Sequence, residues 1–266
     1  MAHVTRLDQE ALTALQHGGT LHASFERSVH VTIGNTLYTI GAHIGAGVHH
    51  IVMSDDFRAG NHFSAGDAVS IAGDSLFIGH RTYTLTNAQI DVHSPFLTHY
   101  SLNLHHVDLS AELTDLLASA DAPSIYDTNA EATLSLPLLT KIRAYLENPT
   151  EPECVIGLGP GLTPLADDIV LGFALGSVAL NETPFTIDQI NPQATTQISY
   201  QSLQDVLARY LTEPLSQFLE DFFVHRTLRS APEILKRGAT SGAGILAGFV
   251  ESIHYWRNHH ERTQNP

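Results

Sequence analysis

Cysteine is almost absent from this sequence, because Cys154 is the single one among 266 residues. A lone cysteine excludes an intrachain disulfide and a cysteine-rich zinc site. It stands in the apolar stretch Cys154-Val155-Ile156, where we expect a buried thiol that packs as a small hydrophobic side chain rather than one that acts as a nucleophile.

Positive charge and long apolar runs are also scarce. The chain has 13 Lys and Arg against 28 Asp and Glu, which gives a formal net charge of −15. This charge repels phosphate backbones and anionic lipid surfaces, so we expect neither nucleic acid nor a membrane as a partner. The longest nearly apolar run, residues 169–180, is too short to cross a bilayer. Because no apolar segment follows the first residue either, we predict a cytoplasmic protein.

The rest of the composition is that of a globular chain with two kinds of secondary structure. Short β-branched or alternating runs fill residues 21–104, and the turn dipeptides Gly34-Asn35 and Gly73-Asp74 separate some of them. Apolar residues recur at helical spacing beyond residue 108. We therefore predict an α+β fold, in which residues 1–107 form an antiparallel β-rich domain, a sheet or small barrel, and residues 108–266 form a mainly helical domain. Helices are expected at residues 7–17, 109–120, 134–146, 169–180, 199–211, 213–225 and 242–257.

The most informative stretch is a glycine-rich loop that leads into a buried helix. Gly159 and Gly161 stand in this loop, Thr163 is the expected N-cap, and Pro164 fits the first helical position. Free N–H groups and the positive end of the helix dipole favour anions at such a terminus. The loop is therefore a candidate anion-binding site on a helical domain.

Two adjacent carboxylates, Asp167 and Asp168, fall in the first turn of that helix. They could cap the helix, hold a cation or orient a substrate amide. Because neighbours on a helix point about 100° apart, at most one of them should face the contents of the loop. The loop lacks the residues that define dinucleotide-binding and P-loop motifs.

A second helix start resembles the first. Thr240-Ser241 opens the last helix, and each of the two helices has glycines four residues apart, at 172 and 176 and at 244 and 248. This spacing lets two helix backbones approach closely. Both N-termini could then face one pocket, unless the similarity is a coincidence between two glycine-rich buried helices.

A basic cluster precedes the second helix start. It consists of Arg226, Arg229, Lys236 and Arg237. Guanidinium groups bind carboxylate and phosphate bidentately, and Arg237 stands beside the second helix terminus, so we expect Arg237 to contribute to anion binding. The other cations are typical of a solvated helix end.

Gly159-Pro160-Gly161-Leu162-Thr163-Pro164, with Asp167-Asp168 and Gly172 behind it, resembles the signature of the AllH family. A Thr-Ser-Gly segment near the C-terminus is a second family feature, and Thr240-Ser241-Gly242 matches it. AllH proteins are associated with oxamate carbamoyltransferase, which acts with carbamoyl phosphate, oxamate and oxalurate in allantoin and purine nitrogen catabolism.

The resemblance implies an enzyme or enzyme subunit that binds a small anionic substrate, with other carbamoyltransferase subunits as expected partners. Asp167 or Asp168 would be catalytic, orienting an amino group or holding Mg²⁺, the one cofactor that we consider. The implied substrate-binding residues are Gly159, Gly161, Thr163, Arg237, Thr240, Ser241 and Gly242.

Two other functions stay open. The family pattern has Ser-Gly where this chain has Leu165-Ala166, and an acid roughly at the place of Gly244, and these departures favour a non-catalytic ligand-binding or scaffold subunit. The third hypothesis is a metal-assisted hydrolase of small amides, with both aspartates and a histidine as ligands. The 17 histidines, however, form no HExxH motif, so no metal site is assigned.

Overall fold

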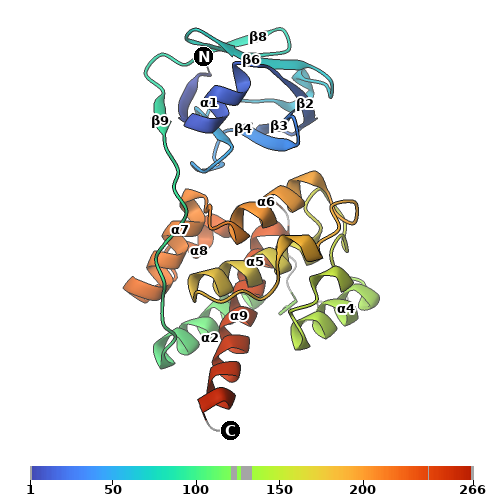
Figure 1. Ribbon diagram of the computed structural model, residues 1–266, viewed down its shortest axis with the longest axis vertical. Coiled ribbons are helices and arrows are strands. Elements are labelled where there is room, and N and C mark those ends of the chain that lie inside the picture. The colour runs from blue at the N-terminus through green and yellow to red at the C-terminus, as the bar shows by residue number, and fades with distance from the viewer. Residues whose placement is uncertain (1, 121–124, 127–133, 239, 265–266) are drawn as a thin grey trace. The chain divides into compact units, whose positions relative to one another are not determined.

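The computed structural model describes residues 2–120, 125–126, 134–238 and 240–264. The chain divides into two compact units. The β unit comprises the residues up to Pro95 together with Tyr210–Glu213, and the helical unit comprises Phe96–Arg209 and the residues from Pro214 onward. Strands lie in the first and helices dominate the second (Figure 1), which confirms the predicted α+β class.

A single curled sheet of nine strands, in the order β8-β7-β6-β2-β3-β4-β5-β1-β9, forms the β unit. Neighbouring strands pair antiparallel except for β4 with β5 and β1 with β9, which are parallel. The strands are β1 (Val4–Asp8), β2 (Gly19–Ser24), β3 (Ser28–Ile33), β4 (Thr36–Gly41), β5 (His50–Met53), β6 (Ala68–Ala72), β7 (Ser75–Ile78), β8 (Arg81–Thr84) and β9 (Gln89–Asp91).

Both predicted turn dipeptides join neighbouring strands. Gly34-Asn35 connects β3 to β4, with Ile33 paired to Thr36. Gly73-Asp74 connects β6 to β7 in the same way. The φ angles of the two glycines are 60° and 55°, in the left-handed region that glycine adopts without strain. The turn chemistry of the sequence therefore predicts these two hairpins correctly.

The first helix, α1 (Gln9–Leu15), is shorter than predicted because a strand precedes it. Leu7 belongs to β1, where pairing with β5 and β9 satisfies the backbone. Asp8 ends the strand and caps the helix, since its carboxylate accepts the Ala11 N–H at 3.2 Å. Leu7, Ala11 and Leu15 are fully buried and contribute to the core of the β unit.

The helical unit contains seven longer elements in its described part. They are α2 (Leu104–Ser119), α4 (Leu136–Glu147), α5 (Leu165–Ala179), α6 (Gln197–Leu207), α7 (Glu213–Glu220), α8 (Ala231–Leu235) and α9 (Ser241–Gln264). The predicted helix over residues 213–225 ends early as an α-helix and continues as a π-helical turn, Asp221–His225. Arg226, with φ of 55°, closes that turn.

Every residue of α5 is buried. Figure 1 shows this helix in the middle of the helical unit, with α6 and α9 close to it. Beyond the two aspartates of its first turn the helix is almost wholly apolar, and a helix without a polar face needs neighbours all round. None of the helices in the described part of the chain combines the length and apolar character needed to span a membrane.

Candidate functional site

Helices α5 and α9 pack backbone against backbone through glycines on both sides. A Cβ atom at Gly172 would lie 1.9 Å from the carbonyl oxygen of Ile245. One at Gly248 would lie 1.9 Å from the carbonyl oxygen of Ile169. Neither position has room for a side chain, so the glycine spacing on the two helices reflects one shared interface.

The two helices run in the same direction. Asp168, in the first turn of α5, lies against Gly244 in the first turn of α9, and farther along Gly176 lies against Ser252. Early residues of α5 contact early residues of α9, and later residues contact later ones, so the helices are parallel and both N-termini lie at the same end. Both positive dipole ends therefore act on one region, as the similar helix starts had suggested.

Two hydroxyl groups join the helix N-termini. The Thr163 Oγ1 and Ser241 Oγ atoms are 2.6 Å apart. Thr163 is therefore not the N-cap that we predicted: Pro164 occupies that position and Leu165 is the first helical residue. The Thr163 hydroxyl is hydrogen-bonded to Ser241 and does not cap the helix. The N–H of Ala166, in the first turn, donates to the Leu158 carbonyl oxygen at 3.1 Å.

The glycines of the loop have φ angles that other residues rarely adopt, 81° at Gly157, 119° at Gly159 and 100° at Gly161. A Cβ at Gly157 would lie 1.9 Å from the Ala194 carbonyl oxygen, and one at Gly159 would lie 2.8 Å from the Leu165 nitrogen. Gly161 has open space around it, so its φ angle alone requires glycine. Residues 159–162 are exposed and can meet a ligand from solvent.

Asp167 ties the loop to the rest of the unit. Its Oδ1 accepts the Gly157 N–H at 2.6 Å, and its Oδ2 accepts the Thr195 hydroxyl. Burial raises the pKa of Asp167, and these hydrogen bonds oppose the rise. One carboxylate oxygen of Asp167 therefore holds the loop backbone, and the other holds the hydroxyl of Thr195.

Asp168 has a different environment. It is 4% exposed, and its Oδ2 has no hydrogen-bond partner among the residues that the structure describes. Burial raises the pKa of Asp168 to about 7, and the negative charge of Asp167 adds to the rise. The Ser241 and Thr163 hydroxyls and the charge of Arg237 oppose it. At neutral pH this carboxyl can therefore both accept and release a proton.

Arg237 precedes α9 and interacts electrostatically with Asp168. Its side chain is partly buried, and burial lowers its pKa while the charges of Asp168 and Glu233 act in the opposite direction. The structure thus places Arg237 near the acid in the first turn of α5. Of the predicted site residues, Thr163, Asp168, Arg237 and Ser241 come together at the paired helix N-termini.

Thr240 and Gly242 have backbone roles at the start of α9. The Gly242 N–H donates to the Arg237 carbonyl oxygen at 3.0 Å, and the Gly244 N–H donates to the Thr240 carbonyl oxygen at 2.9 Å. A Cβ at Gly242 would lie 2.1 Å from the Ile234 carbonyl oxygen. The N–H of Gly242 is therefore engaged within the protein, and the close packing there accounts for glycine at this position.

Two residues that sequence reasoning missed, Thr195 and Thr196, also hold the loop. Thr196 Oγ1 donates to the Leu162 carbonyl oxygen at 2.6 Å and accepts the Ser199 N–H at the start of α6. Thr195 binds Asp167. A Thr-Thr pair directly before a helical pattern is a capping signal, but nothing local indicates that it also reaches a loop more than thirty residues earlier.

Cys154 is exposed, which contradicts the predicted burial. It ends a short 3-10 helix, Pro152–Cys154, and its thiol donates to the Glu151 carbonyl oxygen at 3.0 Å. The apolar stretch that suggested burial turns inward only after it, since Val155 and Ile156 are buried. A turn at residues 155–157 follows the 3-10 helix, so the environment of the apolar residues differs from that of Cys154.

No group of three or more His, Cys, Asp or Glu side chains in the described ranges is arranged to hold a metal ion. Asp167, one of the proposed ligands of a metal-assisted hydrolase, has both oxygens in hydrogen bonds. The arrangement at the helix N-termini is that of an acid beside hydroxyl and guanidinium groups.

These features define an α+β protein with a candidate site at two helix N-termini that lie at the same end. Residues 155–253 match the model of the family oxamate carbamoyltransferase subunit AllH. This match confirms the resemblance indicated by the glycine loop, and it spans the loop, α5 and the first half of α9. The matched segment covers less than half of the chain and lies almost wholly in the helical unit. No curated protein and no solved structure gives a significant match to the chain.

Proposed function

We propose that the protein is a carbamoyltransferase component of the oxamate and carbamoyl phosphate type, acting in purine or allantoin nitrogen catabolism. The observation that carries this proposal is Asp168, a buried carboxyl with an unpartnered oxygen beside two helix N-termini. It lies within the segment that matches the AllH family.

In this proposal the substrate anion lies at the shared end of α5 and α9. Gly159 and Gly161 bring the exposed loop backbone to the ligand, and one hydroxyl of the Thr163–Ser241 pair donates to it while the other donates within the pair. Arg237 supplies positive charge at this site in a chain with more than twice as many acidic as basic residues. Fixed donors at helix N-termini favour an anion without a general excess of basic residues.

Asp168 acts as the acid and base in the reaction. When the amide nitrogen of oxamate attacks the carbonyl carbon of carbamoyl phosphate, a C–N bond forms and the C–O bond to phosphate breaks. Phosphate leaves with the bonding electron pair, and the nitrogen loses a proton, which Asp168 accepts. In the reverse direction Asp168 returns the proton. A pKa of about 7 suits both directions at neutral pH.

Asp167 is a positioning residue on this view, because it holds Gly157 and Thr195 rather than facing the ligand. Loop N–H groups and the free hydrogen of the Thr163–Ser241 hydroxyl pair then stabilise the negative charge that develops on the carbonyl oxygen. Preorganised donors of this kind are a large contribution to catalysis in acyl-type transfer.

The test is a carbamoyl-transfer assay with the purified chain, alone and mixed with its partner subunits, with and without Mg²⁺. Asp168→Asn should lower kcat by at least about 100-fold while the fold is kept, because it removes proton transfer. Asp188→Asn, which neutralises an exposed acid of the same unit, is the matched control and should leave kcat unchanged.

Activity that requires the partner subunits would make the chain one component of a larger enzyme. A wild-type kcat for Asp168→Asn in the active assembly would remove Asp168 from the chemistry and support the alternative, a ligand-binding or scaffold subunit. The departures at Leu165-Ala166 and Gly244 from the family pattern favour that alternative.

A further inference from the structure

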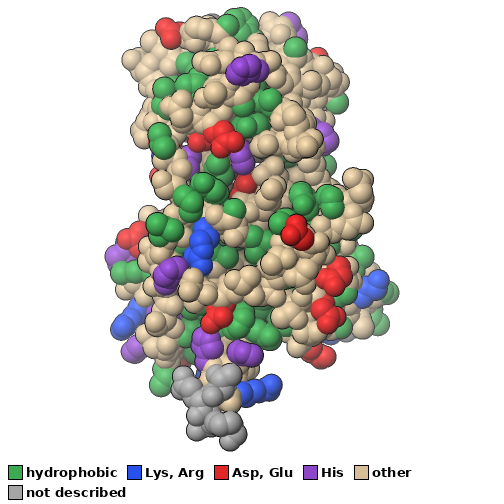
Figure 2. All heavy atoms as spheres, in the orientation of Figure 1, with side chains coloured by type: hydrophobic (Ala, Val, Ile, Leu, Met, Phe, Trp, Pro, Cys, Tyr) green, Lys and Arg blue, Asp and Glu red, His purple; other side chains and the backbone are tan. Residues whose placement is uncertain are grey.

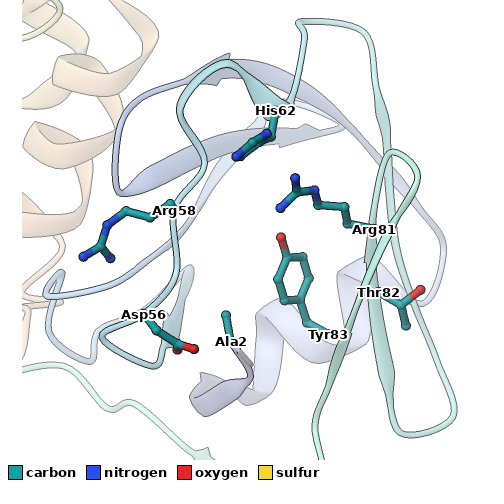
Figure 3. Close-up of a pocket in the computed structure, with 7 residues that line it drawn as sticks. All are labelled: Ala2, Asp56, Arg58, His62, Arg81, Thr82 and Tyr83. Atoms are coloured by element: carbon teal, nitrogen blue, oxygen red, sulfur yellow. The ribbon is translucent and has the colours of Figure 1, made fainter.

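The β unit contains a pocket of about 300 Å³ that is separate from the site at the helix N-termini. Its lining residues are Ala2, Asp56, Arg58, His62, Arg81, Thr82 and Tyr83. Figure 3 shows the guanidinium of Arg81, the hydroxyl of Tyr83 and the ring of His62 turned toward the same space. Three groups that can donate hydrogen bonds therefore converge in one hollow.

Strand geometry places two of these groups. A two-residue turn, Gly79-His80, joins β7 to β8, so Arg81 is the first residue of β8 and pairs with Ile78. Side chains two apart on a strand share a face, which brings Tyr83 to the same side as Arg81. Thr82 points the other way (Figure 3). The register of one hairpin thus fixes both donors.

The loop that carries the remaining residues is tied down. Backbone bonds join Ala59 N–H to the Glu26 carbonyl oxygen at 2.9 Å and Gly60 N–H to the Phe25 carbonyl oxygen at 2.8 Å. Arg58 donates to the backbone oxygens of Asp55 and Phe57. Because the loop is held in this way, His62 and Arg58 keep their places at the pocket without a ligand.

Positive charge is concentrated here in a chain that has little of it. The protein carries a formal net charge of −15, and the few Lys and Arg side chains visible in Figure 2 are scattered over that face. Neither Arg58 nor Arg81 forms an ion pair with any residue in the described part of the chain. Of the two, the Arg81 guanidinium faces the hollow (Figure 3), and a guanidinium without an acidic partner in such a position is typical of a site for an anion.

Apolar surface backs the Arg81 guanidinium. Its central carbon lies 5.9 Å from the centroid of the Phe63 ring, and Phe63 is buried. Tyr83 packs edge-to-face on Phe57 at 5.5 Å between centroids. Arg81 is partly buried, so solvent screens its attraction for an anion less than that of a fully exposed side chain. Asp56 lies at the opposite end of the pocket, beside Ala2 (Figure 3), and accepts the Ser54 hydroxyl at 2.6 Å.

We propose that this pocket binds the phosphate or carboxylate group of a small molecule, with Arg81, His62 and the Tyr83 hydroxyl as its donors. Arg58 also lines the pocket, but its guanidinium is turned away from these three groups and donates to backbone oxygens (Figure 3). The site belongs to the β unit and does not depend on the proposed carbamoyltransferase function.

The test is a titration of the ¹⁵N-labelled full chain, followed by NMR, with inorganic phosphate in one arm and malonate in the other. Sodium chloride at equal ionic strength is the reference. We expect saturable shifts at the Arg81 Nε and at the amides of residues 58–62 and 81–83. Signals of residues 157–163 and 240–244 report any separate binding at the helix N-termini, so the two sites are read independently.

Arg81→Gln should weaken binding at the pocket by at least 10-fold, because it keeps the length of the side chain but removes its charge. Arg27→Gln removes the same charge from an exposed position of the β unit outside the pocket and should change the affinity less than 2-fold. If Arg81→Gln does not fold, His62→Gln replaces it, with an expected loss of at least 3-fold.

Comparison of the two arms separates the ligand classes. Tighter binding of phosphate identifies a phosphorylated molecule, and tighter binding of malonate identifies a carboxylic acid. Absence of saturable shifts at residues 58–62 and 81–83, or equal shifts with sodium chloride, would overturn the proposal. Unchanged affinity in the folded Arg81→Gln protein would overturn it as well.

Discussion

Two neighbouring carboxylates in the first turn of α5 have different surroundings. Asp167 accepts hydrogen bonds with both oxygens, whereas Oδ2 of Asp168 has no partner in the described structure. The helical period predicts from sequence that the two side chains diverge, but not which one faces the second helix. That choice depends on Thr195, far along the chain, which binds Asp167.

The raised pKa of Asp168 predicts a stability change with pH. In the unfolded chain this carboxyl has a pKa near 3.9, and in the folded protein it is about 7. Between these values the folded state binds the extra proton, so this group makes the free energy of unfolding fall as pH rises from about 4 to about 7. Each pKa unit corresponds to about 1.4 kcal/mol, which sets an upper limit of roughly 4 kcal/mol.

Asp168→Asn should therefore flatten this fall and make the protein more stable than wild type at pH 8. Urea unfolding at pH 4.5 and pH 8 measures the difference. Asp188→Asn, at an exposed position, should keep the wild-type dependence. The same pH dependence in Asp168→Asn and wild type would show that Asp168 does not carry the shifted pKa.

At the scale of elements, the glycine contacts between α5 and α9 make a strong prediction. Gly248→Ala places a Cβ where the structure leaves 1.9 Å to the Ile169 carbonyl oxygen. The higher helix propensity of alanine should raise the free energy of unfolding by about 1 kcal/mol. Overpacking should lower it by about 1–3 kcal/mol, and by more when the backbone must move. We expect the clash to dominate, with lower stability in urea unfolding.

Asn258→Ala, at an exposed position of the same helix, is the matched control. It changes helix propensity without touching the interface, so it should be neutral or slightly stabilising. A Gly248→Ala protein as stable as wild type would mean that α5 and α9 do not approach as closely as described.

Local sequence signals predict many of the helices and strands. They fail where contacts with residues distant in the sequence determine the structure. The hairpins at Gly34-Asn35 and Gly73-Asp74 and the paired glycine helices follow from turn chemistry and residue spacing. β1 was missed because its five residues are held by pairing with β5 and β9, which no local pattern records. The pocket of the β unit was missed for the same reason, since His62 and Arg81 face the same hollow only after the chain folds.

At the scale of the whole molecule, the two compact units predict how a local defect spreads. The defect of Gly248→Ala lies in the helical unit. Hydrogen exchange followed by mass spectrometry should therefore become faster in α5 and α9 and stay unchanged in β2, β3 and β4. Equal acceleration in both units would show that they unfold as one cooperative structure.

The wide separation of α5 and α9 in the sequence affects how the protein emerges from the ribosome. Helix α5 is buried along its full length, yet its main partner begins only at Ser241. The segment from 180 to 240 must be synthesised first, at about 5–20 residues per second. For several seconds the nascent chain therefore exposes an apolar helix, and we expect chaperones to cover it until α9 arrives and completes the carboxylate site.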